Sequence, residues 1–239
     1  MVNTKRLCGA LLVGTLAGCA TSGGNPADPL EPLNRVVFSF NDAADRAVIK
    51  PVARAYRAML PGIVRTGVSN FFSNLEDIWI SVNDVLQGKF QEGVDDFGRV
   101  LFNSTFGIAG IFDFASELGL QKHNEDFGQT LGSWGVGSGA YLVLPILGPS
   151  SIRDGFGLLL DTQADLVFYV DGVPVHNSLY GTRAISNRAN LLDASSVIDQ
   201  AALDKYSFVR DAWLQRRRNL VYDGNPPRER EEPDDEPTK

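Results

Sequence analysis

The chain has 239 residues, of which 44% are hydrophobic, and a formal net charge of -7. This acidic balance makes the protein a poor candidate for binding nucleic acid or for electrostatic adhesion to anionic lipid head groups. Its two cysteines, Cys8 and Cys19, lie within the first twenty residues, so the rest of the chain has no thiol for a disulfide and must be held together by its core.

The N-terminal segment has the order of residues found in a secretory signal peptide. Lys5 and Arg6 precede an apolar run over 7–16, which is too short to span a bilayer as a helix. The run ends in Leu16-Ala17-Gly18-Cys19, where small residues before a cysteine resemble the lipobox of bacterial lipoproteins. The alternative is an ordinary cleaved signal peptide with an incidental cysteine.

We predict that residues 1–18 are a lipoprotein signal peptide and that the mature chain begins at a lipid-modified Cys19. Several acyl chains on one cysteine anchor a protein stably, because each buried methylene contributes about 0.8 kcal/mol. Ala20 follows the cysteine. An aspartate there would resemble a signal for retention in the inner membrane, so its absence implies transport to the outer membrane of a Gram-negative cell, with the body on the periplasmic face.

The rest of the chain divides into three parts by composition. Residues 19–32 are rich in Gly, Ser, Pro and Asp, which predicts a lipidated, flexible tether. Residues 33–222 have the length of a single domain. Residues 223–239 consist largely of Pro, Glu, Asp and Arg without apolar spacing, which predicts a disordered polar tail.

Apolar residues at three- and four-residue spacing predict amphipathic helices over much of the domain. The spacing covers 30–49 and 52–60 on either side of Pro51, which should end or kink the first helix, then 63–75, 78–86, 90–101, 191–203 and 206–221. Only 141–147 and 166–175 are candidates for extended chain. We therefore expect an all-α fold.

The middle of the domain is rich in both glycine and apolar residues. Twelve of the 24 glycines lie between residues 98 and 157. A water-soluble core could bury the apolar residues of this region, but the predicted lipid anchor would already hold the body against a bilayer, where an exposed apolar face is stabilised. Because no run reaches the roughly twenty residues of a spanning helix, we expect helices that lie in the plane of one leaflet.

Two sequence blocks carry a resemblance to a known family. Residues 125–136 read Glu-Asp-Phe-Gly-Gln-Thr-Leu-Gly-Ser-Trp-Gly-Val, and residues 144–154 contain Leu-Pro followed by Leu-Gly-Pro-Ser-Ser-Ile-Arg-Asp. With Asn34-Arg35, Asn70–Leu75 and Asn103–Thr105, they resemble the MlaA family, also called VacJ lipoproteins, over about residues 28–222. Ala140 and Lys205 stand where the family usually has proline, which affects local loop geometry only.

The resemblance implies an all-helical ring in the inner leaflet of the outer membrane, with a central amphipathic channel. It implies that the protein removes phospholipid from the outer leaflet, passes it to the periplasmic carrier MlaC, and associates with trimeric porins, which maintains lipid asymmetry. Phospholipid is then the transported substrate, and no cofactor is expected. A scaffold lipoprotein of the cell envelope that moves no lipid is the alternative.

A ring embedded in one leaflet needs an apolar outside and a polar bore. The candidate membrane-facing residues are Phe106, Ile108, Ile111, Phe112, Phe114, Leu166, Val167 and Phe168. The candidates for the channel or its rim are Asn103, Ser104, Thr105, Gln129, Thr130, Ser133, Gly135, Gly137 and Gly139. A helix cap or turn for the polar triplet, and tight helix packing for the glycines, are equally good alternatives.

Enzymatic function finds little support. The chain has no Gly-x-Ser-x-Gly elbow, no phosphate-binding Gly-x-x-x-x-Gly-Lys loop and no His-Glu-x-x-His. His123 lies near Glu125 and Asp126 in sequence, which is compatible with a hydrolytic or metal site, but an exposed loop histidine is the simpler interpretation. We predict no enzymatic activity and no metal site, and we expect Glu125, Asp126, Arg153 and Asp154 to form structural pairs or caps.

Overall fold

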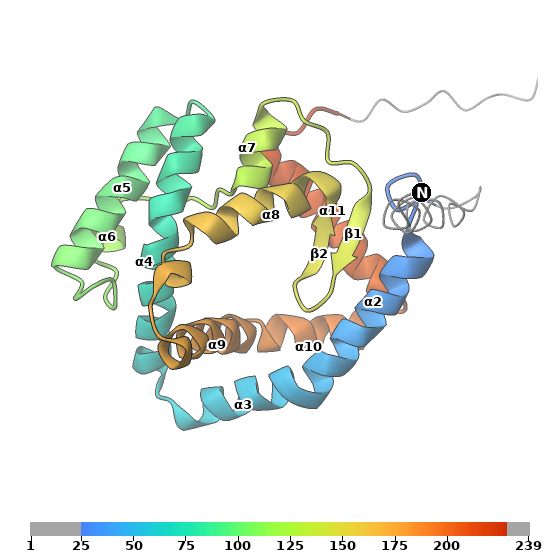
Figure 1. Ribbon diagram of the computed structural model, residues 1–239, viewed down its shortest axis with the longest axis horizontal. Helices are drawn as coiled ribbons and strands as arrows, with labels where there is room; N and C mark the ends of the chain where they lie inside the picture. Colours follow the sequence, from blue (N-terminus) through green and yellow to red (C-terminus); the bar gives the residue numbers. More distant parts are fainter. Residues whose placement is uncertain (1–24, 229–239) are drawn as a thin grey trace, which may run out of the picture.

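The computed structural model describes residues 25–228 (Figure 1). The predicted signal peptide, the predicted lipidation at Cys19 and residues 229–239 of the predicted tail lie outside the described residues. For these parts the predictions stay predictions.

Helices dominate the described chain, as predicted. In chain order the elements are α2 (Glu31–Ala44), a π-helical turn (Asp45–Ile49), α3 (Lys50–Met59), α4 (Gly62–Leu86), α5 (Phe90–Thr105), α6 (Phe114–Glu117), α7 (Phe127–Ser133), β1 (Tyr141–Leu144), β2 (Gly148–Ser151), α8 (Ile152–Ala164), a 3-10 turn (Leu166–Tyr169), α9 (Val173–Asn190), α10 (Leu192–Ala201) and α11 (Lys205–Val221). The two short strands pair antiparallel, with Tyr141 opposite Ser151 and Leu144 opposite Gly148. The all-α prediction is confirmed, with this hairpin as a small addition.

Pro51 is accommodated by the π-helical turn that precedes it. The Lys50 N–H donates to the carbonyl of Asp45, five residues back, instead of the usual four. Proline in the interior of a regular helix would remove one hydrogen bond and press its ring against a carbonyl of the preceding turn. The α-helix is therefore interrupted before Pro51, and α3 starts anew with this proline in its first turn.

Two segments differ from the helices and strands that we expected. The separate patterns 63–75 and 78–86 belong to one continuous helix, α4, of 25 residues. Segment 166–175 is not extended: Asp165 accepts a hydrogen bond from the Val167 N–H at 3.0 Å and caps a 3-10 turn. α9 then begins at Val173 with Pro174 in its first turn, where the fixed φ of proline favours a helix.

The packed elements form a closed circuit of neighbours (Figure 1). α2 leads through the π-helical turn into α3, which packs on α9, and α9 packs on α4. α4 contacts α7, α7 packs on α8, α8 contacts β2, and β1 packs on α2, where the circuit began. α5 packs along α4, and α11 contacts α7 and β2. Elements far apart in sequence therefore fix each other's position.

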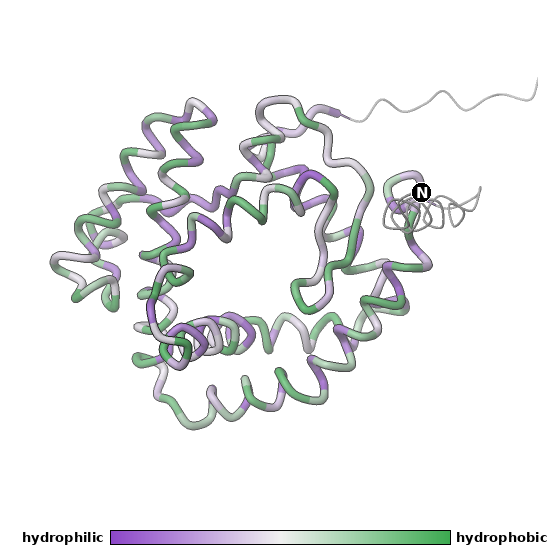
Figure 2. The backbone as a smooth tube through the Cα atoms, viewed as in Figure 1, coloured by the Kyte–Doolittle hydropathy of each residue, from purple (hydrophilic) through white to green (hydrophobic). Residues whose placement is uncertain are grey.

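The interior of the described chain is polar, and much of its surface is apolar. Buried polar and charged residues outnumber buried apolar ones. Six of the buried apolar residues form two small clusters, one at Ala53, Ala189 and Leu192 and the other at Tyr141, Val143 and Tyr206. Many large apolar side chains stay exposed, and Figure 2 shows hydrophobic and hydrophilic positions interspersed along the helices. None of the helices described is long and apolar enough to cross a membrane.

Helices α7 and α8 cross at a pair of glycines. A Cβ atom on Gly157 would lie 2.5 Å from the amide nitrogen of Gly128 and 2.8 Å from its Cα. The two backbones can approach this closely only because neither residue has a side chain. Tight packing, one of the two alternatives for the glycine-rich region, therefore applies to Gly128.

We predict that Gly157→Ala lowers the free energy of unfolding by about 1–3 kcal/mol, the typical cost of overpacking, because backbone atoms cannot move aside. Gly155→Ala is the matched control on the same helix, since its Cβ would meet only Ser150 Oγ at 3.9 Å. Alanine favours helix, so this control should be neutral or slightly stabilising. Denaturant unfolding of the full chain in detergent, followed by circular dichroism, measures both variants. Equal stabilities would contradict the close crossing.

Candidate functional site

The apolar segment 106–114, which connects α5 to α6, contains five candidate membrane-facing residues, and all five are exposed. Their exposed fractions run from 40% for Ile111 to 64% for Phe106 and Ile108. Ile108 has a φ of 52°, in the left-handed region that a β-branched residue rarely adopts. A strained backbone therefore presents these apolar side chains outward.

Asn103 holds this loop from the inside. Its Oδ1 accepts a hydrogen bond from the Ala115 N–H at 2.9 Å, and its Nδ2 donates to Asp113 Oδ1 at 3.0 Å. Because Asn103 is only 3% exposed, it has no surface to offer a channel, and the turn alternative describes it. Ser104 and Thr105 are exposed, and Ser104 Oγ accepts a hydrogen bond from Asn74 at 2.9 Å.

The second apolar segment, residues 166–168, contains three candidate membrane-facing residues, and only two of them are exposed. Leu166 is 43% exposed and Phe168 is 42% exposed. Val167, at 1%, lies in the interior, so its assignment to the membrane-facing set was wrong. The reason is the 3-10 turn, which sends neighbouring side chains in different directions instead of along one apolar face.

Helix α7 and the glycine-rich segment that follows it contain both buried and exposed candidates. Gln129 and Thr130 are 2% and 0% exposed. Gln129 donates to the Asn124 carbonyl at 2.8 Å, and Thr130 donates to Asn83 Oδ1 at 2.7 Å, so both hold the protein frame together and have no surface for a channel. The exposed candidates are Ser133, Gly135, Gly137 and Gly139. Gly135 has a φ of 90°, which explains why glycine is needed there.

An apolar groove of about 460 Å³ opens beside the 106–114 loop. Its lining residues come from α4 (Ile63, Val64, Gly67, Val68, Phe71, Phe72), from the loop (Ile111, Phe112) and from α9 (Leu179, Thr182). A Cβ on Gly67 would lie 2.9 Å from Ile111 Cγ2, so this glycine lets the loop lie against α4. A lining that is almost wholly hydrocarbon suits an apolar chain and not a head group.

Arg217 connects α11 to both α7 and α8. Its Nη1 donates to Asp126 Oδ2 at 2.5 Å, and its Nη2 donates to Asp154 Oδ1 at 2.8 Å. Asp126 also caps α7 by accepting a hydrogen bond from the Gln129 N–H. Burial alone would raise the pKa of Asp126, but the Arg217 guanidinium and the cap hydrogen bond hold it below its ordinary value. The expectation that these carboxylates form structural pairs and caps is confirmed.

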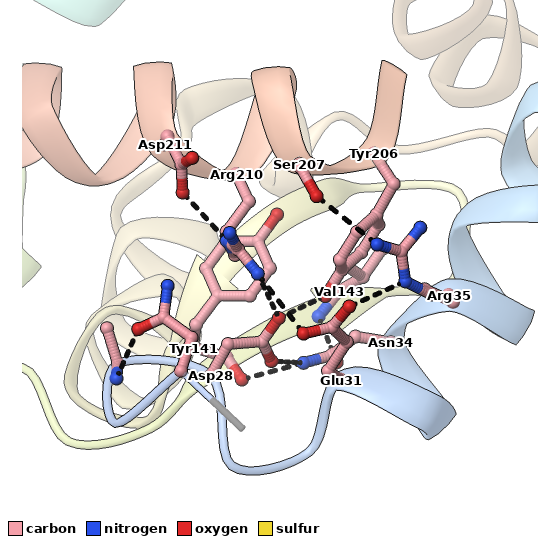
Figure 3. Close-up of polar contacts among 12 residues, drawn as sticks. Asp28, Glu31, Asn34, Arg35, Tyr141, Val143, Tyr206, Ser207, Arg210 and Asp211 are labelled. Carbon is pink, nitrogen blue, oxygen red and sulfur yellow. Dashed lines mark hydrogen bonds and ion pairs between the residues drawn. The ribbon is translucent and has the colours of Figure 1, made fainter. Parts of the chain in front are cut away.

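A buried polar cluster holds the first described residues against the body (Figure 3). Asp28 is 1% exposed; it accepts hydrogen bonds from the Tyr206 hydroxyl and, at 3.3 Å, from Arg210 Nη1, both on α11. Arg210 also reaches Glu31 Oε2 at 3.3 Å. The chain that leads from the predicted anchor is therefore fixed to α11 within nine residues of Cys19.

Two asparagines on α2 bind the outer edge of the hairpin. Asn34 donates to the Tyr141 carbonyl at 3.0 Å and accepts from the Val143 N–H at 2.9 Å. Asn41, two turns later, accepts from the Ile146 N–H at 2.8 Å and donates to the Leu144 carbonyl at 2.9 Å. Their amide groups replace a missing neighbouring strand. The seven-residue spacing on one helix face was the available signal for this role, and a search for apolar positions misses it.

His123 contacts neither carboxylate that is close to it in sequence. Its Nδ1 lies 2.7 Å from Asp96 Oδ2, and its side chain is 21% exposed. Glu125 instead accepts hydrogen bonds from Gln87 Nε2 at 2.7 Å and Lys89 Nζ at 3.1 Å. The simple interpretation of His123 as an exposed loop residue is therefore wrong, because the loop folds back onto α5.

We predict that Arg217→Leu lowers the free energy of unfolding by about 3 kcal/mol at pH 7, near the lower end for a broken buried ion pair because Asp126 keeps some contact with water. Arg216→Leu, at an exposed neighbouring position, should change it little. Since Arg217 lowers the pKa of Asp126, its contribution is complete above about pH 4 and is lost as the pH falls further. Denaturant unfolding between pH 7 and pH 3 measures this; a pH-independent difference would contradict the ion pair.

Comparisons with known proteins agree with this structure. The pattern of the MlaA lipoprotein family matches residues 26–220. The chain is 35% identical over 224 residues to the intermembrane phospholipid transport system lipoprotein MlaA of Escherichia coli (strain K12), covering 90% of this chain and 88% of that protein. It is 32% identical over 234 residues to the Haemophilus influenzae protein of the same name, covering 93% of each. A solved structure described as "Structural basis for maintenance of bacterial outer membrane lipid asymmetry" matches with a TM-score of 0.72 at 35% identity, covering 81% of this chain and 98% of that one. The chain belongs to the MlaA lipoprotein family.

Proposed function

We propose that this protein is a lipoprotein of the outer membrane that removes misplaced phospholipid from the outer leaflet and so maintains lipid asymmetry. The observation that carries the proposal is the distribution of side chains: charged and polar groups are buried between helices, and large apolar groups stay exposed. A protein that lies in a leaflet is stabilised by this arrangement, because the hydrocarbon covers the apolar surface and the buried polar groups bind one another. Family membership supplies phospholipid as the substrate class.

The closed circuit of elements supports a ring around a lipid path. A phospholipid that leaves the outer leaflet must carry its head group past hydrocarbon, which is costly unless polar groups replace the lost water. A ring in the inner leaflet, apolar outside and polar inside, offers such a path. Among the candidate channel or rim residues, the ones with exposed surface are Ser104, Thr105, Ser133, Gly135, Gly137 and Gly139.

The groove between α4 and α9 is suited to an acyl chain. Its lining is apolar, and exposed Phe112 of the 106–114 loop lies at its edge. An acyl chain bound there would keep its hydrocarbon out of water while the head group stays outside the groove. The groove thus provides a place for the tail, and the polar path a place for the head.

The predicted anchor fits this position in the membrane. Asp28 lies nine positions after Cys19, which allows at most about 30 Å of extended chain between the lipid and the buried cluster of Figure 3. Acyl chains on Cys19 in the inner leaflet would keep the body close to that leaflet. Trimeric porins and a soluble periplasmic carrier that resembles MlaC complete the proposal as partners, the first holding the protein in the membrane and the second accepting the lipid. No catalytic step is part of this function.

We predict that Thr182→Trp raises the amount of phospholipid in the outer leaflet toward that of a strain without the protein, because indole fills the groove with apolar volume and adds no charge. The lipidated full-length variant is expressed in the deletion strain, and surface phospholipid is measured by its accessibility to added phospholipase. Protein abundance in the outer membrane is measured in parallel and should stay unchanged.

Thr162→Trp is the control, since Thr162 is exposed on α8 and is not among the residues lining the groove. This variant should restore lipid asymmetry fully. A scaffold lipoprotein that moves no lipid predicts that both tryptophan variants behave alike. Normal asymmetry with Thr182→Trp would therefore contradict the groove as part of a lipid path.

A further inference from the structure

Three potential metal ligands meet where α4 ends, α5 begins and the connector 118–126 returns. Asp84 comes from α4, Asp96 from α5 and His123 from the connector. Each offers one ligand atom, and these atoms all lie within 4.8 Å of one another. One ion could therefore reach all three residues.

The close approach of α4 and α5 creates this meeting point. A Cβ on Gly93 would lie 3.1 Å from the Ser81 carbonyl oxygen and 3.3 Å from Asp84 Cβ, so any larger residue would push the helices apart. The Ser81 hydroxyl donates to the Gly93 carbonyl at 2.7 Å and fixes the contact. Asp96 lies one helical turn after Gly93, which brings its carboxyl group to the same place.

The two carboxyl groups are fully buried, and Asp84 has no basic partner. Both aspartates are 0% exposed, and neither oxygen of the Asp84 side chain has a hydrogen-bond partner. Within the described chain, Asp84 forms no ion pair, and the one basic side chain paired with Asp96 is His123. Burial of a carboxylate without a partner is costly. The structure therefore leaves a polar group that points to a missing ligand.

Two neighbouring acids, in contrast to Asp84, have basic partners. Asp77 pairs with Arg99 at 3.4 Å and also with Lys122. Glu125 pairs with Lys89 at 3.1 Å. The basic residues Lys89, Arg99 and Lys122 therefore form ion pairs with Glu125 and Asp77 instead of with Asp84.

We propose that Asp84, Asp96 and His123 form a binding site for a divalent transition-metal ion, with Zn²⁺ as the best match. One imidazole nitrogen and two carboxylate oxygens are ligands that zinc accepts, whereas Ca²⁺ and Mg²⁺ prefer oxygen ligands alone. Two ionised carboxylates and a neutral imidazole would balance the charge of one divalent ion. The remaining coordination position is open to water.

Such an ion would connect three segments that are distant in sequence. It would join the end of α4 and the start of α5 to the connector, which leads directly to the Asp126 cap of α7. We predicted no metal site because the chain has no known short motif, and residues 84, 96 and 123 are too widely separated to form one. The inference does not depend on lipid transport.

The test is a calorimetric titration of the full chain in detergent with zinc chloride, after removal of metal by a chelator and without a histidine tag. The wild type should bind one Zn²⁺ per chain. Asp84→Asn and His123→Ala should each weaken binding at least ten-fold, and zinc should raise the melting temperature of the wild type but not of these two variants. His176→Ala removes the other of the two histidines and is the matched control for His123→Ala; it should bind zinc as the wild type does.

Several results would overturn the proposal: no saturable zinc binding by the wild type, unchanged binding by Asp84→Asn, or an equal loss with His176→Ala. Magnesium chloride binding as tightly as zinc chloride would also contradict it, since imidazole would then contribute nothing. Circular dichroism checks that each variant is folded. Asp84→Asn keeps the shape of the side chain and carries the test if His123→Ala does not fold.

Discussion

Polar groups buried between helices are the constraint on which the rest of this structure depends. The apolar clusters are small, so the elements are joined mainly by hydrogen bonds and ion pairs that cross from one element to another. Inside a protein each such group must find a partner, because an unpaired one costs more than a paired one contributes. This requirement fixes the helices relative to one another and leaves the large apolar side chains free to face a membrane.

The same constraint connects distant parts of the circuit. Arg217 ties α11 to α7 and α8, Asp28 ties the N-terminal segment to α11, and the two asparagines of α2 satisfy the free edge of β1. A substitution that removes one of these hydrogen bonds or ion pairs leaves the charged or polar partner buried without a compensating contact. A small number of buried polar residues therefore fixes the positions of the elements around the proposed lipid path. The exposed apolar positions need no particular side chain, as long as it is apolar.

Apolar spacing was sufficient to predict most helices, the all-α fold and the interruption near Pro51, because these depend on local sequence. It was not sufficient for side-chain direction. Val167 lies inside a 3-10 turn that periodicity does not reveal, and Gln129 and Thr130 are polar but buried by long-range contacts. The meeting of Asp84, Asp96 and His123 depends on the crossing of α4 and α5, which no local pattern contains. The MlaA resemblance, carried by the block at 125–136, supplied the function that composition alone could only suggest.

We expect the body of the protein, and not only its anchor, to lie in lipid. Photoreactive phospholipids incorporated into the native outer membrane test it most directly, with crosslinked residues identified by mass spectrometry. We expect crosslinks at the exposed loop that contains Phe106 and Ile108 and at Phe168, in addition to the region of Cys19. Crosslinks confined to Cys19 and the tether that follows it would contradict a body that lies in lipid and would favour a scaffold held at the membrane by its acyl chains alone.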